Sequence, residues 1–285
     1  MADFVAIGLR GLAFAAALLA AGMPVFLWVL GSDLDRSAQR IRAAALPVAA
    51  AGLALTIAHA IVEPARLAGA MSGIFDGSLQ SMLLASDFGT TTAIRTLGLV
   101  MIVGGCLKPG RSGEGIALVG GSLVIASFAF MGHTAADPQR WLLAPLLITH
   151  LFAAAFWFGS LWPLATLTRY EDFAVAGAII ERFSSIAVWS VPVIFVAGIV
   201  LASLLLPDLS SLRTPYGLSL ISKVSGFAIL MGLAAMNRWR FGPAISQGQQ
   251  SALKGFRRSV LAEWFLILAV VLVTAAMTAS FSPES

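Results

Sequence analysis

Three histidines are the side chains of this sequence best suited to bind a metal ion or a haem iron. They are His59, His133 and His150, and they occur in a chain of 285 residues that is 59% hydrophobic and only 11% charged. Imidazole is the commonest side-chain metal ligand when it is neutral. The only cysteine is Cys106, so a site built from several thiolates and an internal disulfide framework are both excluded.

Two further candidate ligands stand close to histidines in the sequence. Glu63 follows His59 by four residues, a spacing that puts both side chains on one face of a helix. Met131 precedes His133 by two residues, which would point in nearly opposite directions on a helix unless the chain unwinds at Gly132. The predicted metal ligands are His59, Glu63, Met131, His133 and His150.

Each candidate also has an ordinary structural interpretation. A histidine within a membrane helix often donates an interhelical hydrogen bond, and one at a helix end, such as His133, can cap the helix or be solvated. Methionine commonly fills gaps between apolar helices, which is the alternative for Met131. Glu63 stands next to Pro64 and near Arg66, and is also explained as half of an interfacial ion pair.

The elements that must position these residues are apolar segments long enough to cross a bilayer, which requires roughly 20 residues each. The first segment continues to Leu30, longer than the apolar region of a signal peptide, and predicts a retained helix. A short interfacial helix is expected after Asp76. The fold class is an all-α integral membrane protein, one polytopic domain over 1–285. The eight predicted transmembrane helices are 4–30, 42–63, 90–107, 114–132, 142–167, 183–206, 217–238 and 258–281.

Basic residues predict the orientation of these helices. Cytoplasmic loops carry an excess of Lys and Arg, and the four loops that share one side hold most of them. Both termini are therefore expected on the outer side, which in a bacterium is the periplasm, with all three histidines in the outer half. The formal charge of +4 is spread over many loops and predicts no nucleic-acid partner. The basic residues of those four loops are Arg36, Arg40, Arg42, Lys108, Arg111, Arg169, Arg182, Arg238, Arg240, Lys254, Arg257 and Arg258.

Two similar segments suggest an internal duplication. They are "SDFGTTTAIRTLGLVMIVG" and "TPYGLSLISKVSGFAILMG", and each has a basic residue, Arg95 or Lys223, six positions after an aromatic–Gly pair. Two four-helix repeats in parallel orientation, 1–140 and 141–285, would follow; the alternative is chance similarity between Ala- and Gly-rich helices. Arg95 and Lys223 are expected to extend their charged ends to the interface.

A carboxylate is also predicted within the membrane on the opposite side. Glu263 stands in the last apolar segment, near the end of the segment that finishes at Asn237. A carboxylate at that depth requires partners. It is interpreted as a structural clamp, with a ligand for a departing ion as the alternative.

The motifs "MGHTAAD", "THLFAAAFWFGSLWPL", "TPYGLSLISK", "NRWR" and "FRRSVLAEW", in this order, resemble the CopD copper-resistance family of bacterial inner-membrane proteins. The resemblance implies an eight-helix protein that moves copper inward from the periplasm, often beside a small periplasmic copper carrier, CopC. It also implies metal-site roles for His133 and His150. Copper suits imidazole, with thioether for the monovalent ion and carboxylate for the divalent one.

Copper import is the function that these observations favour, by a transporter rather than an enzyme. The sequence contains no GxxxxGK[ST] loop, and an inside-negative membrane potential favours cation entry by about 2.3 kcal/mol per charge and 100 mV. One alternative is a b-type haem redox protein, because two histidines on facing helices can hold haem. Another is a copper-binding sensor or docking protein that transports nothing.

Overall fold

The computed structural model describes residues 2–34, 36–131, 137–205 and 213–280. Within these ranges the regular structure is helical, without a strand, and eight helices are long and apolar enough to cross a membrane. The predicted all-α integral membrane class is confirmed. The elements are α1 (Ala2–Leu30), η1 (Gly31–Asp33), α2 (Ala38–Ala68), η2 (Met71–Phe75), α3 (Gly77–Leu84), α4 (Asp87–Leu107), α5 (Arg111–Ser127), η3 (Phe128–Phe130), α7 (Arg140–Tyr170), α8 (Phe173–Leu205), α9 (Pro215–Met236), η5 (Asn237–Phe241), α10 (Gly242–Ser246) and α11 (Gln250–Ser280).

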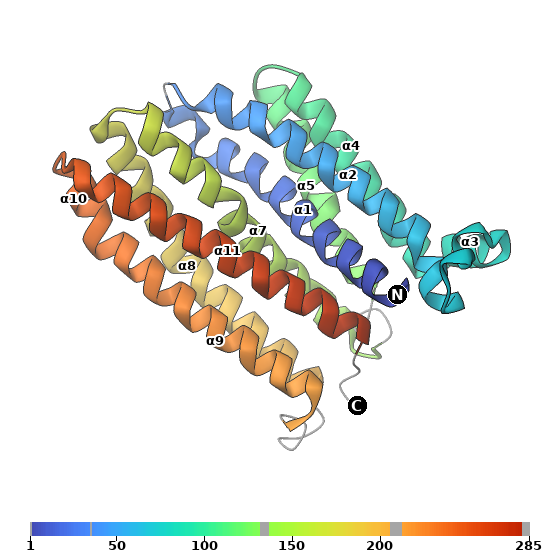
Figure 1. The fold of residues 1–285 in the computed structure, drawn as a ribbon. Helices are drawn as coiled ribbons and strands as arrows, with labels where there is room; N and C mark the ends of the chain where they lie inside the picture. The colour runs from blue at the N-terminus through green and yellow to red at the C-terminus, as the bar shows by residue number, and fades with distance from the viewer. Residues whose placement is uncertain (1, 35, 132–136, 206–212, 281–285) are drawn as a thin grey trace.

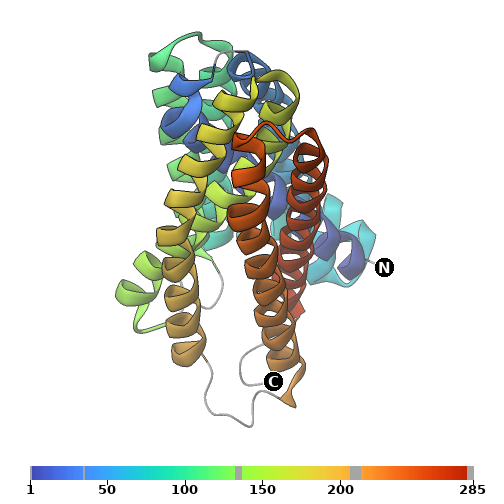
Figure 2. The same cartoon turned by 90° about the vertical axis from the view of Figure 1, so that its left-hand side faces the viewer.

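Helices α1 and α7 lie against each other in the middle of the bundle (Figure 1). On one side, α1 packs against α2 and α5, and α4 packs against α2 and α5; on the other side, α7 packs against α8 and α11, with α9 against α11 (Figure 2). We call the end of the bundle where α1 begins and α2 ends the α3 end. The opposite end, where α7 ends and α11 begins, is the α10 end.

Small residues allow α1 and α7 to cross in close contact. A β-carbon on Gly22 would lie 1.8 Å from the carbonyl oxygen of Ala155, and one on Gly159 would lie 2.5 Å from the backbone of Gly22. Only glycine fits at such a crossing, a common device in membrane helices because it brings backbones into van der Waals contact. Consistent with the central position of α1, 72% of the residues in its most apolar stretch are buried, a larger share than in any other described span.

Several helices extend beyond their predicted ends. Helix α8 begins at Phe173 rather than at 183, and α11 begins at Gln250 rather than at 258. Helix α8 begins with an apolar stretch, 173–180, which Glu181 and Arg182 separate from the predicted segment. The start of α11 is polar, because the hydrogen-bonded backbone continues beyond the apolar part that hydropathy marks. The same effect carries α2 to Ala68, so Glu63 and Arg66 lie inside a helix.

A π-helical turn, η5, follows α9 where the sequence predicts a loop. The Gly242 N–H donates to the carbonyl oxygen of Asn237, five residues earlier. Pro243, at the start of α10, has no N–H to donate, and its ring would clash with the preceding turn of an α-helix. A wider turn relieves that clash and continues the helix toward Ser246.

The short interfacial helix predicted after Asp76 is present as α3, which projects from the side of the bundle (Figure 1). The carboxylate of Asp76 accepts hydrogen bonds from the N–H groups of Ser78 and Leu79 and caps the helix. Hydrogen bonds, first from the Ser78 side chain and then from the Leu79 backbone, hold the pKa of Asp76 below its usual value. The apolar side chains of Met82 and Leu84 are exposed on α3, as expected for a helix in the membrane interface.

Candidate functional site

The last turns of α2 bring two predicted ligands together at the α3 end. His59 Nε2 lies 3.3 Å from Glu63 Oε2, and both residues are only 5% exposed. The other carboxylate oxygen of Glu63, Oε1, accepts a hydrogen bond from Arg66 Nε at 2.7 Å and forms an ion pair with Arg66 Nη2 at 2.6 Å. The predicted pairing of His59 with Glu63 on one helix face is confirmed, and so is the ion pair with Arg66.

The imidazole of His59 has an incompletely used nitrogen. Its ring packs edge-on against Phe88 of α4, with 5.6 Å between ring centroids. Although Nε2 is near Glu63, the contact lacks hydrogen-bond geometry, and Nε2 has no hydrogen-bond partner among the described residues. A buried nitrogen without a partner costs free energy that a bound ion or a proton shared with Glu63 would recover.

Met131 lies beside a buried arginine at the same end of the bundle. Arg95 of α4, 3% exposed, donates from Nη2 to Met131 Sδ at 3.6 Å and from Nε to Ser127 Oγ at 3.1 Å. Its guanidinium also lies 4.1 Å from the ring centroid of Phe128. Met131 has an extended backbone, φ −139° and ψ 159°, so the helix has already ended there. The unwinding required for Met131 and His133 to face one ion therefore begins at Met131.

The expectation that Arg95 extends its charge to the interface is wrong. The side chain is held inside by Ser127, Met131 and the Phe128 ring, and its charge has no carboxylate within ion-pair distance among the described residues. Cation–π contacts and the thioether take the place of water here. The position of Arg95 within the predicted segment 90–107 was the feature of the sequence that could have indicated its burial.

Arg10 of α1 is a second cation at this end that the sequence reasoning did not single out. It donates to Thr278 Oγ1 of α11 at 3.2 Å, and its guanidinium lies 5.3 Å from the ring centroid of Phe14. Arg95 lies 5.2 Å from the same ring, so Phe14 is shared by the two arginines. Arg10 also interacts electrostatically with Glu63. The carboxylate of Glu63 therefore lies near two positive charges, those of Arg66 and Arg10.

His150 is on the other side of the bundle, between α7 and α8. Its Nδ1 lies 3.0 Å from the carbonyl oxygen of Ile194, and Gly198 leaves room beside the ring. Because a carbonyl only accepts, Nδ1 carries the proton and Nε2 keeps its lone pair. Histidines that bind metals commonly anchor their other nitrogen in this way. Lys223 of α9 is close enough to interact electrostatically with the ring.

The described residues do not bring all the predicted ligands to one point. His59 and Glu63 share α2 and contact α4, Met131 follows η3, and His150 contacts α8. His133 lies outside the described residues. Within the described ranges, no group of three His, Cys, Asp or Glu side chains is arranged to hold a metal ion. A site with His59 and His150 as joint ligands is not assembled in this conformation.

The intramembrane carboxylate predicted near Asn237 has a partner that the sequence did not indicate. Glu263, 2% exposed, accepts hydrogen bonds from Trp157 Nε1 at 3.0 Å and from Asn237 Nδ2 at 2.5 Å. Its partners come from α7 and η5, so one side chain of α11 joins three elements. No Lys or Arg lies within ion-pair distance of Glu263 in the described structure.

Comparison with known proteins gives matches along most of the chain. A family model described as "Copper resistance protein D-like, N-terminal domain" matches residues 1–142, and one described as "Copper resistance protein D" matches residues 177–277. These ranges cover the helices on the α1 side and most of those on the α7 side.

Two curated proteins are similar in sequence. Copper resistance protein D of Pseudomonas syringae pv. tomato is 27% identical over 247 residues, which is 74% of this chain and 75% of that protein. Copper transport protein CutJ of Bacillus subtilis (strain 168) is 28% identical over 160 residues, 54% of this chain but only 28% of CutJ. Both family models and the first relative agree, and the chain belongs to the copper resistance protein D family.

Proposed function

We propose that this copper-related membrane protein carries copper inward across the bacterial inner membrane, as a transporter rather than an enzyme. Family membership and the names of both relatives support copper as the cargo. The observation that carries the proposal is the buried pair of His59 and Glu63 at the α3 end. It combines imidazole and carboxylate, two ligand types that copper accepts, at the end of the bundle that the distribution of Lys and Arg predicts to face the periplasm.

Glu63 supplies the negative charge that this proposed entry site needs in order to attract a cation. Copper approaches an end of the bundle that already contains Arg10, Arg66 and Arg95, and Glu63 offsets the charges of Arg66 and Arg10. One carboxylate oxygen binds Arg66, while the other faces His59. Copper bound between His59 and Oε2 of Glu63 would place a second positive charge on a carboxylate that Arg66 already binds through Oε1, so we expect the ion to weaken the contact with Arg66.

Met131 and His133 are proposed to complete the entry site. The extended backbone at Met131 removes the helical geometry that would point the two side chains apart. Thioether, imidazole and carboxylate together could hold either oxidation state of copper. The thioether of Met131 now accepts a hydrogen bond from Arg95, so its use as a ligand requires an arginine to move.

His150 is proposed as a second station, deeper in the membrane. With Nδ1 fixed on the Ile194 carbonyl, the lone pair of Nε2 is available to an ion. The nearby charge of Lys223 weakens cation binding there. Weak binding suits a station that must pass its ion onward, because conduction requires each site to release what it binds.

The membrane potential supplies a driving force in the proposed direction. An inside-negative potential favours entry of a monovalent cation by about 2.3 kcal/mol per 100 mV, without ATP. A periplasmic CopC-like carrier is the proposed donor of copper to the α3 end, as the family resemblance implies. Two exposed methionines at this end, Met71 and Met82, offer thioethers along the approach.

Copper accumulation in cells tests the proposal. Cells that produce the protein should contain more copper than cells that lack it, with a smaller gain at acidic external pH because protonated imidazole cannot bind a metal. His150→Ala should abolish the gain. His150→Gln is the matched control, because its amide N–H can still bond the Ile194 carbonyl: it should also fail, since it provides no imidazole.

A gain preserved in His150→Gln but lost in His150→Ala would assign His150 a structural hydrogen bond and remove it from the pathway. Unchanged or lower cellular copper on production of the protein would overturn import. An intense Soret band in the purified protein would instead support the b-type haem alternative.

A further inference from the structure

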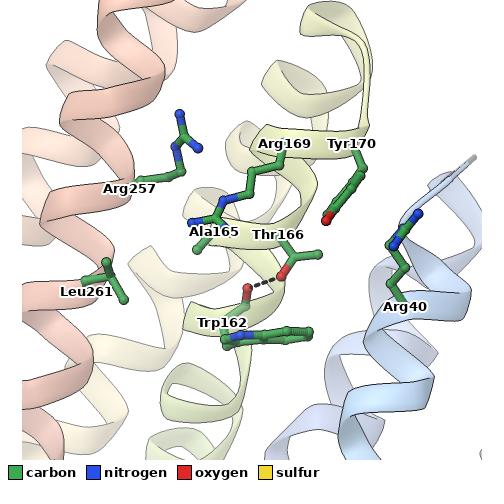
Figure 3. A pocket seen from close by; sticks show the side chains of 8 residues that line it. All are labelled: Arg40, Trp162, Ala165, Thr166, Arg169, Tyr170, Arg257 and Leu261. Atoms are coloured by element: carbon green, nitrogen blue, oxygen red, sulfur yellow. Dashed lines mark hydrogen bonds between the residues drawn. The ribbon is translucent and has the colours of Figure 1, made fainter.

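A cationic pocket lies at the α10 end, far from the histidines. It has a volume of about 250 Å³ and is formed by α2, α7 and α11 (Figure 3). Three arginines line it, one from each helix: Arg40, Arg169 and Arg257. Tyr170 and Trp162 supply aromatic walls, and the guanidinium of Arg40 lies 4.2 Å from the ring centroid of Tyr170.

Three other arginines at this end have acidic partners among the described residues. At the same end of the bundle, Arg36 pairs with Asp172, Arg42 with Glu114, and Arg182 with Asp33.

Among the described residues, no carboxylate lies within ion-pair distance of the three pocket arginines, and none lines the pocket. Three arginines that line one cavity favour an anion, and the planar N–H pairs of guanidinium match the oxygens of phosphate.

An apolar groove continues from this pocket toward the middle of the bundle. It has a volume of about 190 Å³ and shares Trp162 and Leu261 with the pocket. Its other walls are apolar side chains of α7 and α11, including Trp264 and Phe265. From Arg257 to Phe265 the axis of α11 advances by about 12 Å. Over this distance the lining side chains change from charged to apolar, along a path that runs into the predicted membrane-spanning part of the helix.

We propose that the pocket and the groove together bind an anionic phospholipid, with its phosphate among Arg40, Arg169 and Arg257 and an acyl chain along Trp162, Leu261 and Phe265. Leu261 and Phe265 are 46% and 62% exposed, as expected where lipid is the solvent. Clusters of arginine at a membrane surface attract anionic lipids, and here they are joined to an apolar track. A free anion would use only the arginines, whereas a phospholipid would use both the arginines and the apolar groove, so the two features together favour a lipid.

Lipid binding to the purified full-length protein tests this proposal. Native mass spectrometry would compare phosphatidylglycerol with phosphatidylcholine of identical acyl chains. The protein should retain phosphatidylglycerol with an affinity at least about tenfold higher. The variant R40Q/R169Q/R257Q should lose this preference. The matched control R238Q/R240Q/R258Q removes equal charge at the same end of the bundle and should keep it.

The remaining outcomes overturn the proposal. Equal loss in both triple variants would show that lipid preference follows total charge, and no preference in the unaltered protein would show that the pocket selects nothing. Release of phosphatidylglycerol by excess inorganic phosphate, with phosphate bound in the absence of lipid, would identify a free anion as the occupant. If the triple variant does not fold, the exposed Arg169→Gln alone should still reduce the preference measurably.

Discussion

The carboxylate of Glu63 contacts two side chains that have opposite effects on copper binding. The imidazole of His59 can bind the ion together with Glu63, whereas the positive charge of Arg66 opposes its binding. The spacing of His59 and Glu63 already predicted their contact, because residues four apart on a helix always share a face. The burial of Arg95 and the partial burial of Arg10 were not predictable in this way. Arg95 of α4 depends on Phe14 of α1 and Phe128 of η3, and Arg10 of α1 depends on Thr278 of α11.

Replacing Glu63 with Gln should weaken copper binding by about tenfold or more, about 1.4 kcal/mol, because a neutral amide removes an anionic ligand and leaves Arg66 and Arg10 uncompensated. Glu114→Gln is the matched control: it also breaks an arginine pair, with Arg42, but at the α10 end. Titration of the purified protein with copper measures both. Equal affinities in the Glu63 variant and the unaltered protein would remove Glu63 from the site.

At the scale of elements, single polar contacts and close glycine crossings hold the helices together. Trp157, Asn237 and Glu263 join α7, η5 and α11 by two buried hydrogen bonds. Proximity of Glu263 to Asn237 followed from the order of the segments. The role of Trp157 did not, because an apolar-looking run gives no indication of which face of α7 meets α11.

The substitution Trp157→Phe should lower the free energy of unfolding by about 1–3 kcal/mol, the usual cost of leaving a buried partner without its hydrogen bond. Trp189→Phe, at a side chain 79% exposed, should have little effect. Unfolding of both variants in detergent would be followed together with copper transport. Normal stability with lost transport would show that Glu263 serves the departing ion instead of clamping helices.

The crossing of α1 and α7 should be equally sensitive to size. Gly22→Ala places a β-carbon against the Ala155 carbonyl and should lower the melting temperature markedly, or prevent folding. Gly8→Ala changes the same helix where nothing lies within 4 Å and should be neutral or slightly stabilising, since alanine favours helix by about 1 kcal/mol over glycine. Similar melting temperatures for the two variants would contradict the close crossing.

For the molecule as a whole, hydropathy was sufficient to find all eight spans and the helical class, but not the helix ends or the partners of buried charges. Apolar segments report contact with lipid, whereas α11 begins in polar sequence and α8 continues past the charged residues Glu181 and Arg182. The anchor of His150 on Ile194 depends on how two long helices meet. The proposed repeats, 1–140 and 141–285, stay a prediction. So does the orientation that places the α3 end in the periplasm.

Reporter fusions would test that orientation. A reporter active only in the periplasm should be active after Ser285 and silent at Gly110, because most Lys and Arg residues lie on the Gly110 side. A reporter active only in the cytoplasm should give the inverse result at the same two positions. Activity reversed at both positions would place the histidines inside and convert the proposed import path into an exit path.

Copper entry into liposomes that contain only the purified full-length protein is the most direct test of inward transport through the histidines. Entry, followed with an enclosed copper indicator, should exceed that into protein-free liposomes and should accelerate when an inside-negative potential is imposed. Glu63→Gln and His150→Gln should each slow it by about tenfold, the factor given by about 1.4 kcal/mol, whereas Glu114→Gln should not. Copper entry no faster than into protein-free liposomes would contradict the account. So would entry through the Glu63→Gln and His150→Gln variants as fast as through the unaltered protein.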